Sequence, residues 1–312
     1  MNIFFVISPL IIIGFIGFLT TKYNRFNKAQ IDSLSKFTFN IAIPAYMFQL
    51  LANTDLSKVD LTIYAAFYLP IVLLYALAWS ANFYFHQNFK TSTPASAIYA
   101  LGCSHSNNVV VGMPVAIMVL GEQVLPIISI IISLHAALLF GITSLLTANE
   151  KNFQWQKFFK QIFYNPLLIS VVSGFTFNLL GFHLPSIIND SLLLLGRPAI
   201  TLALFLLGAS LTFYKINSEI KFILFASILK LILLPLMVFS SCHFIFQFDS
   251  LTTTILVILS ASPTAVNAYL VAKQQTIHQD TVAGIVVVTT LLSVVTLPLW
   301  IWLLSQTISM NG

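Results

Sequence analysis

Long apolar stretches separated by short polar connections run through the whole chain and predict helices that cross a membrane. A bilayer core about 30 Å thick needs roughly 20 helical residues per crossing. The apolar runs are continuous and do not alternate with a period of two, which argues against a barrel of strands. Ten segments can be drawn, at 3–21, 34–53, 61–85, 94–120, 123–147, 163–182, 190–211, 220–246, 252–273 and 281–305.

The composition leads to the same class. Of the 312 residues, 58% are hydrophobic and 7% are charged, whereas a soluble domain carries about 25% charged residues. We therefore predict an all-α integral membrane protein in contact with lipid. The net charge of +5 does not point to nucleic acid, because most charges lie in short connections. Cys103 and Cys242 lie in apolar stretches, so neither a disulfide nor a metal framework is expected.

Lysine and arginine are distributed unevenly between the two sides, which predicts the orientation. Cytoplasmic connections carry an excess of these residues. The first basic residues follow the first apolar run, the reverse of a secretory signal peptide, so we expect a retained first helix. With both termini outside the cell (inner) membrane, only Lys58 and Arg197 lie on the outer side. The cytoplasmic side receives Lys22, Arg25, Lys28, Lys36, Lys90, Lys151, Lys157, Lys160, Lys215, Lys221 and Lys273.

The two halves of the chain carry a weak repeat. Residues 8–18 resemble residues 165–175, with Pro9 opposite Pro166 and Gly17 opposite Gly174. Chance matching in apolar sequence is the alternative. The repeat predicts five-helix units at 1–147 and 163–312, joined by a cytoplasmic connection at 148–162. Five is odd, so the second unit enters the membrane inverted, as in many secondary transporters.

Polar residues and helix breakers interrupt two of the segments. The stretch SHSNNVVVGMPV (104–115) contains Gly112 and Pro114, and its counterpart after the half-chain shift contains Pro263. Broken backbone at membrane depth is tolerated only beside protein or a water-filled cavity, and paired interruptions in two halves point to a transporter's binding site. Ordinary proline kinks are the alternative. The candidate residues are Ser104, His105, Ser106, Asn107, Asn108, Gly112, Pro114, Pro263, Thr264 and Asn267, with Ser262 beside them.

Three further polar residues lie inside predicted spans. Lys230 is either a functional residue that faces the bundle interior or a lysine that snorkels to the interface. Asn40, four residues before Pro44, either faces the cavity or bonds between helices. His135 is more typical of packing, whereas His105 lies inside the polar cluster. We include Lys230 and Asn40 among the substrate-binding candidates.

The signs of the charges favour an anionic substrate. All the carboxylates lie in loops or at segment ends, so no buried carboxylate for proton or sodium coupling is evident, although backbone carbonyls could still bind a cation. Half-helix N-termini at the breaks carry partial positive charge, and Lys230 adds to it. No cofactor is expected, and the coupling ion, proton or sodium, stays open.

An ordered set of motifs resembles the auxin efflux carrier family of membrane transport proteins. Asn107, Gly112 and Pro114 match the N-x-x-x-x-G-x-P pattern of the family's fourth helix. The resemblance spans essentially the whole chain. The other matching stretches are Asn40-Ile-Ala-Ile-Pro44, Asn165-Pro-Leu-Leu168, Leu207-Gly-Ala-Ser-Leu211, Ser262–Gln274 and Thr296–Trp300.

This resemblance implies ten helices in two inverted five-helix repeats, with crossing, broken helices 4 and 9 and elevator-like alternating access. The family includes plant auxin exporters and bacterial carriers for malate or malonate, and the short central connection is similar to the bacterial branch. Two departures bear on substrate choice: His105 is bulkier and more basic than expected, and Asn108-Val109 replaces a pair that is usually small.

Together these features predict a secondary transporter or facilitator of small organic anions, either a dicarboxylate such as malate or malonate or an auxin-like weak acid. The alternatives are a receptor or sensor that binds the anion without moving it, and an intramembrane enzyme. The sequence has no HExxH motif and no paired intramembrane aspartates, so an enzyme is not expected. Self-association into a homodimer is left open.

Overall fold

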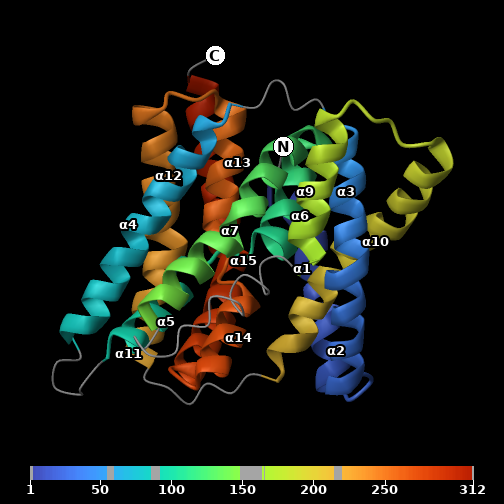
Figure 1. Cartoon of the computed structure of the whole chain (residues 1–312). Helices are drawn as coiled ribbons and strands as arrows, with labels where there is room; N and C mark the ends of the chain where they lie inside the picture. The colour runs from blue at the N-terminus through green and yellow to red at the C-terminus, as the bar shows by residue number, and fades with distance from the viewer. Residues whose placement is uncertain are drawn as a thin grey trace.

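The computed structural model describes residues 3–54, 60–85, 92–147, 164, 166–213 and 220–310, and all regular elements within these ranges are helices (Figure 1). Five of the described helical stretches are long and apolar enough to cross a membrane: Thr62–Tyr84, Glu122–Thr147, Ser186–Leu211, Ile220–Ile245 and Gln279–Gln306. The predicted all-helical, multi-pass class is confirmed. The connection expected at 148–162 lies outside the described residues.

Within the described ranges the helices follow one another without a strand between them. The first half contains α1 (Ile3–Lys22), α2 (Lys28–Phe37), η1 (Thr38–Ala42), α3 (Ile43–Ala52), α4 (Thr62–Phe85), α5 (Thr93–Ser104), η4 (Asn108–Gly112), α6 (Met113–Leu120), η5 (Glu122–Val124) and α7 (Leu125–Thr147). The second half contains α9 (Pro166–Leu179), α10 (Ser186–Leu211), α11 (Ile220–Ile228), η6 (Leu229–Leu233), α12 (Leu234–Ser240), η7 (Ser241–Ile245), α13 (Ser250–Ala261), α14 (Val266–Gln275) and α15 (Gln279–Met310).

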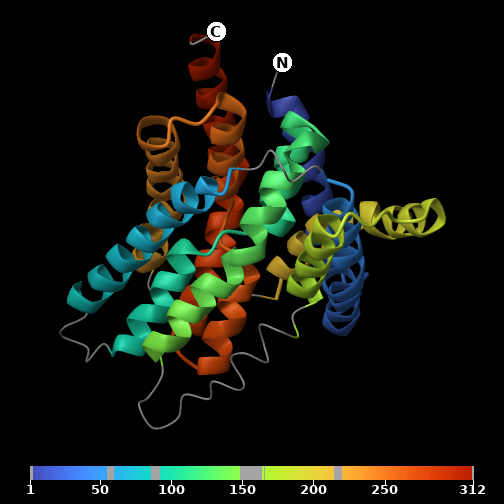
Figure 2. The ribbon, with the colours of Figure 1, turned by 45° about the horizontal axis from the view of Figure 1, so that its top comes forward.

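The described helices form two groups that lie side by side (Figures 1 and 2). In the smaller group, α1 packs on α10 and α3 packs on α9 and α10. The larger group contains α4 to α7 and α11 to α15, in which α5 contacts α4 and α7, and α13 contacts α12 and α15. The two groups meet where α1 contacts α6 and α15 and where α7 contacts α3 and α9.

Two glycines make reciprocal contacts within the smaller group. A Cβ on Gly17 of α1 would lie 2.0 Å from the carbonyl oxygen of Phe205 in α10, and a Cβ on Gly174 of α9 would lie 3.0 Å from that of Phe48 in α3. The two glycines are 157 residues apart, and so are the two phenylalanines, Phe48 and Phe205. The close approach of α1 to α10 is therefore repeated by α9 and α3 with the halves exchanged.

Prolines set the position of three π-helical turns. The elements η1, η4 and η6 each end two residues before a proline, at Pro44, Pro114 and Pro235. A proline has no N–H for the carbonyl four residues earlier, and its ring crowds that carbonyl. The wider π turn accommodates this loss. Behind Pro235 the freed carbonyl of Leu231 accepts a hydrogen bond of 2.9 Å from the indole nitrogen of Trp300.

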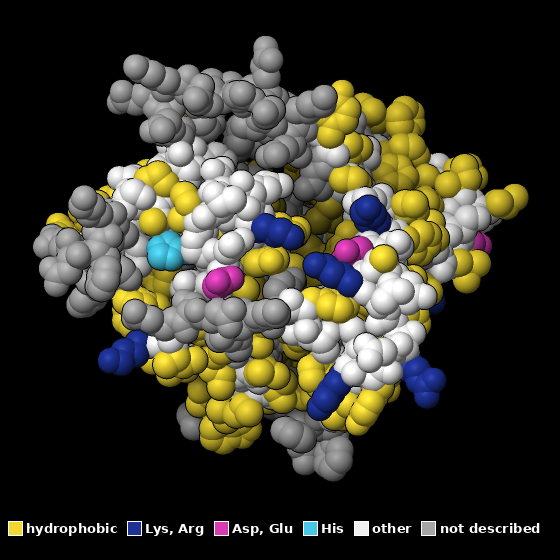
Figure 3. Space-filling view, turned by 90° about the horizontal axis from the view of Figure 1, so that it is seen from below, with side chains coloured by type: hydrophobic (Ala, Val, Ile, Leu, Met, Phe, Trp, Pro, Cys, Tyr) yellow, Lys and Arg dark blue, Asp and Glu magenta, His cyan; other side chains and the backbone are white. Residues whose placement is uncertain are grey.

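Basic side chains collect at the lower end of the molecule as drawn in Figure 1. Lys22 lies in the last turn of α1 and Lys28 begins α2. Lys221 lies in the first turn of α11, and Lys273 lies in the last turn of α14. Figure 3 shows Lys and Arg side chains on this face, around a hollow in it. The start of α1 and the end of α15 lie together at the opposite end (Figures 1 and 2).

Candidate functional site

The first helix break lies at residues 105–107. Helix α5 ends at Ser104, and η4 begins at Asn108. The side chain of Asn107 caps η4, because its Oδ1 accepts a hydrogen bond from the Val110 amide at 3.3 Å. The break therefore precedes the Gly-x-Pro that predicts it. Pro114 lies in the first turn of α6, directly after the π turn η4, which accommodates the missing N–H.

The second break lies at residues 262–265, between α13 and α14. Ser262 is extended, as expected for a residue that precedes a proline, here Pro263. The Ser262 hydroxyl donates to the carbonyl of Ile258 at 3.0 Å. Both breaks are buried, so their backbone groups need partners inside the protein.

The two breaks supply partners to each other. The amide of Asn107 donates to the carbonyl of Pro263 at 2.8 Å, and the amide of Ala265 donates to the carbonyl of His105 at 3.0 Å. Ser106 and Thr264 face each other between these bonds as an antiparallel pair. The two donors, Asn107 and Ala265, are 158 residues apart, and so are the two acceptors, His105 and Pro263. The breaks thus cross in the larger helix group, related by a local two-fold axis.

The long helix that comes after each broken segment, α7 or α15, satisfies one more amide. His135 on α7 accepts a hydrogen bond from the Ser106 amide at its Nε2, at 3.1 Å. Thr289 on α15 accepts one from the Thr264 amide at its Oγ1, also at 3.1 Å. The Thr264 hydroxyl in turn donates to the Gly102 carbonyl at 2.8 Å. His135, which the sequence favours as a packing residue, therefore holds the first break directly.

Gly112 allows the two broken segments to pack closely. A Cβ at this position would lie 2.8 Å from the Ser262 Oγ and 2.9 Å from the Leu259 Cδ2. Distances this short require a shift of the neighbouring atoms, so a side chain at residue 112 is incompatible with the present contact. The glycine of the Gly-x-Pro motif is explained by the approach of η4 to α13.

Lys230, in η6, joins the first break to the last turn of α13. Its side chain is fully buried, with 0% exposure, and its Nζ donates to the Ser106 Oγ at 2.8 Å and to the Ser260 carbonyl at 2.6 Å. Of the two interpretations of this lysine, burial in the interior applies and snorkelling does not. All the described carboxylates are exposed instead: Asp32, Asp60, Glu122, Asp190, Asp249 and Asp280.

Several buried polar atoms at the crossing have no hydrogen-bond partner within the described part of the chain. They are the Nδ1 atoms of His105 and His135 and both polar atoms of the Asn108 side chain. The two imidazole rings stack with 4.9 Å between their centroids. Each unsatisfied buried polar group costs about 1–3 kcal/mol. Such a concentration favours a polar ligand that donates to and accepts from these atoms.

Two of the predicted site residues are not brought into this cluster. The side chains of Asn40, in η1, and Asn267, in the first turn of α14, are exposed. Within η1 it is Thr38 and Ala42 that face the interior. The Ser104 hydroxyl is buried at the crossing but donates to its own helix, to the Ala100 carbonyl at 2.8 Å.

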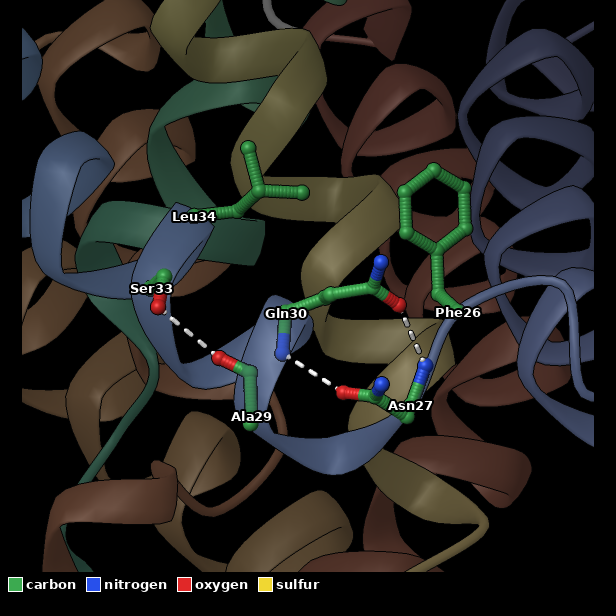
Figure 4. Close-up of a pocket in the computed structure, with 6 residues that line it drawn as sticks. All are labelled: Phe26, Asn27, Ala29, Gln30, Ser33 and Leu34. Atoms are coloured by element: carbon green, nitrogen blue, oxygen red, sulfur yellow. Dashed lines mark hydrogen bonds between the residues drawn. The ribbon is translucent and has the colours of Figure 1, made fainter.

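A separate open pocket lies at the start of α2 (Figure 4). Its lining includes Asn27 and Gln30, whose side chains and amides bond each other reciprocally at 2.9 Å. The Ser33 hydroxyl donates to the Ala29 carbonyl. Asn27 and Gln30 cap the helix and the Ser33 hydroxyl bonds within it, so these polar groups are engaged, unlike the unpartnered atoms at the crossing. Among the described residues, no group of three His, Cys, Asp or Glu could hold a metal ion.

Comparison with known proteins identifies the family. A family model described as "Membrane transport protein" matches residues 3–301. A Methanothermobacter thermautotrophicus protein named "Uncharacterized transporter" is 24% identical, covering 95% of this chain and 96% of its own length. A Rhizobium meliloti protein named "Putative malonate transporter" is 23% identical (93% and 92% covered), and the Escherichia coli K12 protein named "Uncharacterized transporter YfdV" is 24% identical (94% and 95%). The resemblance seen in the motifs is confirmed: the chain belongs to the membrane transport protein family that includes the auxin efflux carriers.

Proposed function

We propose that this protein is a secondary transporter of small organic anions, and that the anion binds at the crossing of the two helix breaks. The observation that carries the proposal is the buried junction itself, in which Lys230 and the unpartnered atoms of His105 and Asn108 lie beside two interrupted helices. Interrupted helices in corresponding positions of two halves form the binding sites of many secondary transporters.

The charges at the crossing support an anion. The helical stretches η4 and α14 begin at the two breaks, and helix N-termini stabilise negative charge. Lys230 contributes a buried amine, and the described carboxylates are exposed elsewhere. A carboxylate would accept hydrogen bonds from the Asn108 amide and a histidine N–H. Dicarboxylates such as malonate and malate, or an auxin-like weak acid, have this chemistry, and one relative is named "Putative malonate transporter".

The pattern of contacts supports an inverted repeat of ten membrane-crossing segments. The reciprocal glycine contacts in the smaller group follow a shift of 157 residues, and the reciprocal hydrogen bonds at the crossing follow one of 158. Two independent regions thus have nearly the same relation between the halves. The basic end in Figure 3 is then cytoplasmic, and both termini lie outside the inner membrane.

The division into two helix groups supports elevator-like alternating access. The crossing lies in the larger group, where η6 contacts both α5 and α13, and the smaller group would serve as the fixed scaffold. His105 and Asn108 are each 3% exposed, so the site in this structure is closed to solvent. Movement of the larger group along the smaller would open it to one side and then the other.

Uptake by proteoliposomes tests the proposal. Vesicles loaded with unlabelled malonate, malate or indole acetate are diluted into a trace of the labelled compound, with proton and sodium gradients imposed in turn. Exchange of at least one of these anions is expected. Binding of the labelled anion by purified protein without exchange would instead support a receptor or sensor. Failure to bind or exchange any of them would contradict an organic-anion site.

A further inference from the structure

Four helix ends converge on the crossing, and their partial charges have opposite signs. Helices α5 and α13 end there, whereas η4 and α14 begin there. Helix C-termini carry partial negative charge and favour cations, and N-termini favour anions. In transporters with broken helices, backbone carbonyls and half-helix C-termini bind the coupling sodium ion or proton. An anion that binds at the N-termini leaves the C-terminal side to be balanced by a cation.

Lys230 already occupies that cationic position. Its Nζ donates to the Ser260 carbonyl, in the last turn of α13, at 2.6 Å and to the Ser106 hydroxyl in the first break at 2.8 Å. A carbonyl and a hydroxyl are also the oxygen ligands that a small monovalent cation would use. The lysine comes from η6, an element outside both breaks, so its amine reaches the oxygens as a tethered cation.

The groups around this amine do not offer it another counter-charge. Cys103, His105 and His135 are the buried titratable side chains at the crossing, and none is a carboxylate. The described carboxylates are exposed. The Ser106 hydroxyl and the Ser260 carbonyl are therefore the oxygens that the amine binds here, and the bound substrate would supply the negative charge.

We propose that Lys230 is a built-in substitute for a coupling cation: its ammonium joins the first break to the C-terminal end of α13 as a bound sodium ion would, so that anion transport proceeds without sodium. This inference rests on the proposed transport function, but it also predicts a cation-binding property that can be measured without a substrate. Removal of the amine, with space left in its place, creates a site for a small monovalent cation.

Thermal unfolding in detergent tests the cation site. The Lys230→Ala variant is compared with Lys230→Met, which removes the charge but refills most of the volume. In choline chloride, both variants should unfold at a lower temperature than the wild type. Addition of sodium or methylammonium chloride should raise the unfolding temperature of Lys230→Ala, and should leave Lys230→Met and the wild type unchanged. Equal responses of all three proteins would overturn the proposal.

Exchange by proteoliposomes supplies the second arm. Its first measurement uses the wild type alone, so it tests the proposal even where Lys230→Ala does not fold. Wild-type exchange at the same rate in sodium and in choline is expected, and a rate that falls on sodium removal overturns the built-in cation while leaving the transport function intact. Exchange by Lys230→Ala should be lost in choline and restored by sodium or methylammonium. Loss that neither cation restores would overturn the proposal.

Discussion

Replacing Thr289 with valine removes one hydrogen-bond acceptor from the crossing and changes little else. Valine has the shape of threonine, with a methyl group in place of the hydroxyl. Thr289 Oγ1 accepts the amide hydrogen of Thr264 at 3.1 Å and donates to the Ile285 carbonyl at 2.7 Å. Since Thr264 is fully buried, its amide would have no acceptor in the variant.

The neighbouring residue provides a matched control. Thr290 Oγ1 donates to the Val286 carbonyl at 2.7 Å, the same kind of bond that Thr289 makes to Ile285. Among the described residues, the Thr290 hydroxyl accepts no hydrogen bond from another segment. Thr290→Val therefore measures the loss of stability that both variants share, which comes from removing the hydroxyl and its bond to the carbonyl four residues earlier. The difference between the two variants isolates the buried amide, for which we expect about 1–3 kcal/mol, or roughly a 5- to 150-fold shift in the unfolding equilibrium.

Equilibrium unfolding in mixed detergent micelles measures this difference. Cys103 and Cys242 are buried in the folded protein, so the reaction of a fluorogenic maleimide with them reports unfolding. Thr289→Val should unfold at a lower denaturant fraction than Thr290→Val. If the two variants were equally stable, Thr289 would not hold the second break, and the account of how the breaks are satisfied would be refuted.

Two further predictions concern packing and the proline-freed carbonyl. Gly112→Ala should destabilise the protein by about 1–3 kcal/mol through overpacking, because its Cβ would meet the Ser262 Oγ at 2.8 Å. The control is Gly14→Ala, whose Cβ would lie 3.7 Å from the Leu204 carbonyl oxygen, and it should be at least as stable as the wild type in the same unfolding assay. A smaller loss of stability for Gly112→Ala than for Gly14→Ala would contradict the close contact. Trp300→Phe removes the donor to the buried Leu231 carbonyl and should lower the free energy of unfolding by about 1–3 kcal/mol. Trp302→Phe, at a half-exposed position, should lower it little. Equal effects of the two variants would show that the indole hydrogen bond does not stabilise η6.

The hydrophobic pattern was sufficient to predict the helical class and the interrupted segments, because burial in lipid demands long apolar runs. It was less precise about the break itself. The pattern places the interruption at Gly112 and Pro114, but the non-helical residues are 105–107. Pro114 lies in the first turn of α6, and the non-helical residues come before the π turn η4. The glycine serves contact with α13 rather than flexibility.

Other site residues could not be assigned because helices that are apolar on all sides do not reveal which face points inward. Asn40 and Asn267 are exposed, whereas Lys230 is buried. Similarly, nothing local distinguishes Thr289 from Thr290. Their roles depend on which helix lies beside the second break, and only the packed structure supplies that. For His135, a histidine within an apolar span was the available signal.

The central claim, that the crossing binds the transported anion, is tested most directly by Asn108→Leu. Both polar atoms of the Asn108 side chain are buried and have no partner among the described residues, so an apolar residue of similar size should leave the stability unchanged or raise it. We predict that this variant unfolds no earlier than the wild type yet loses anion exchange in proteoliposomes by at least about tenfold, equivalent to about 1.4 kcal/mol. A stable Asn108→Leu protein that exchanges the anion at the wild-type rate would contradict the claim.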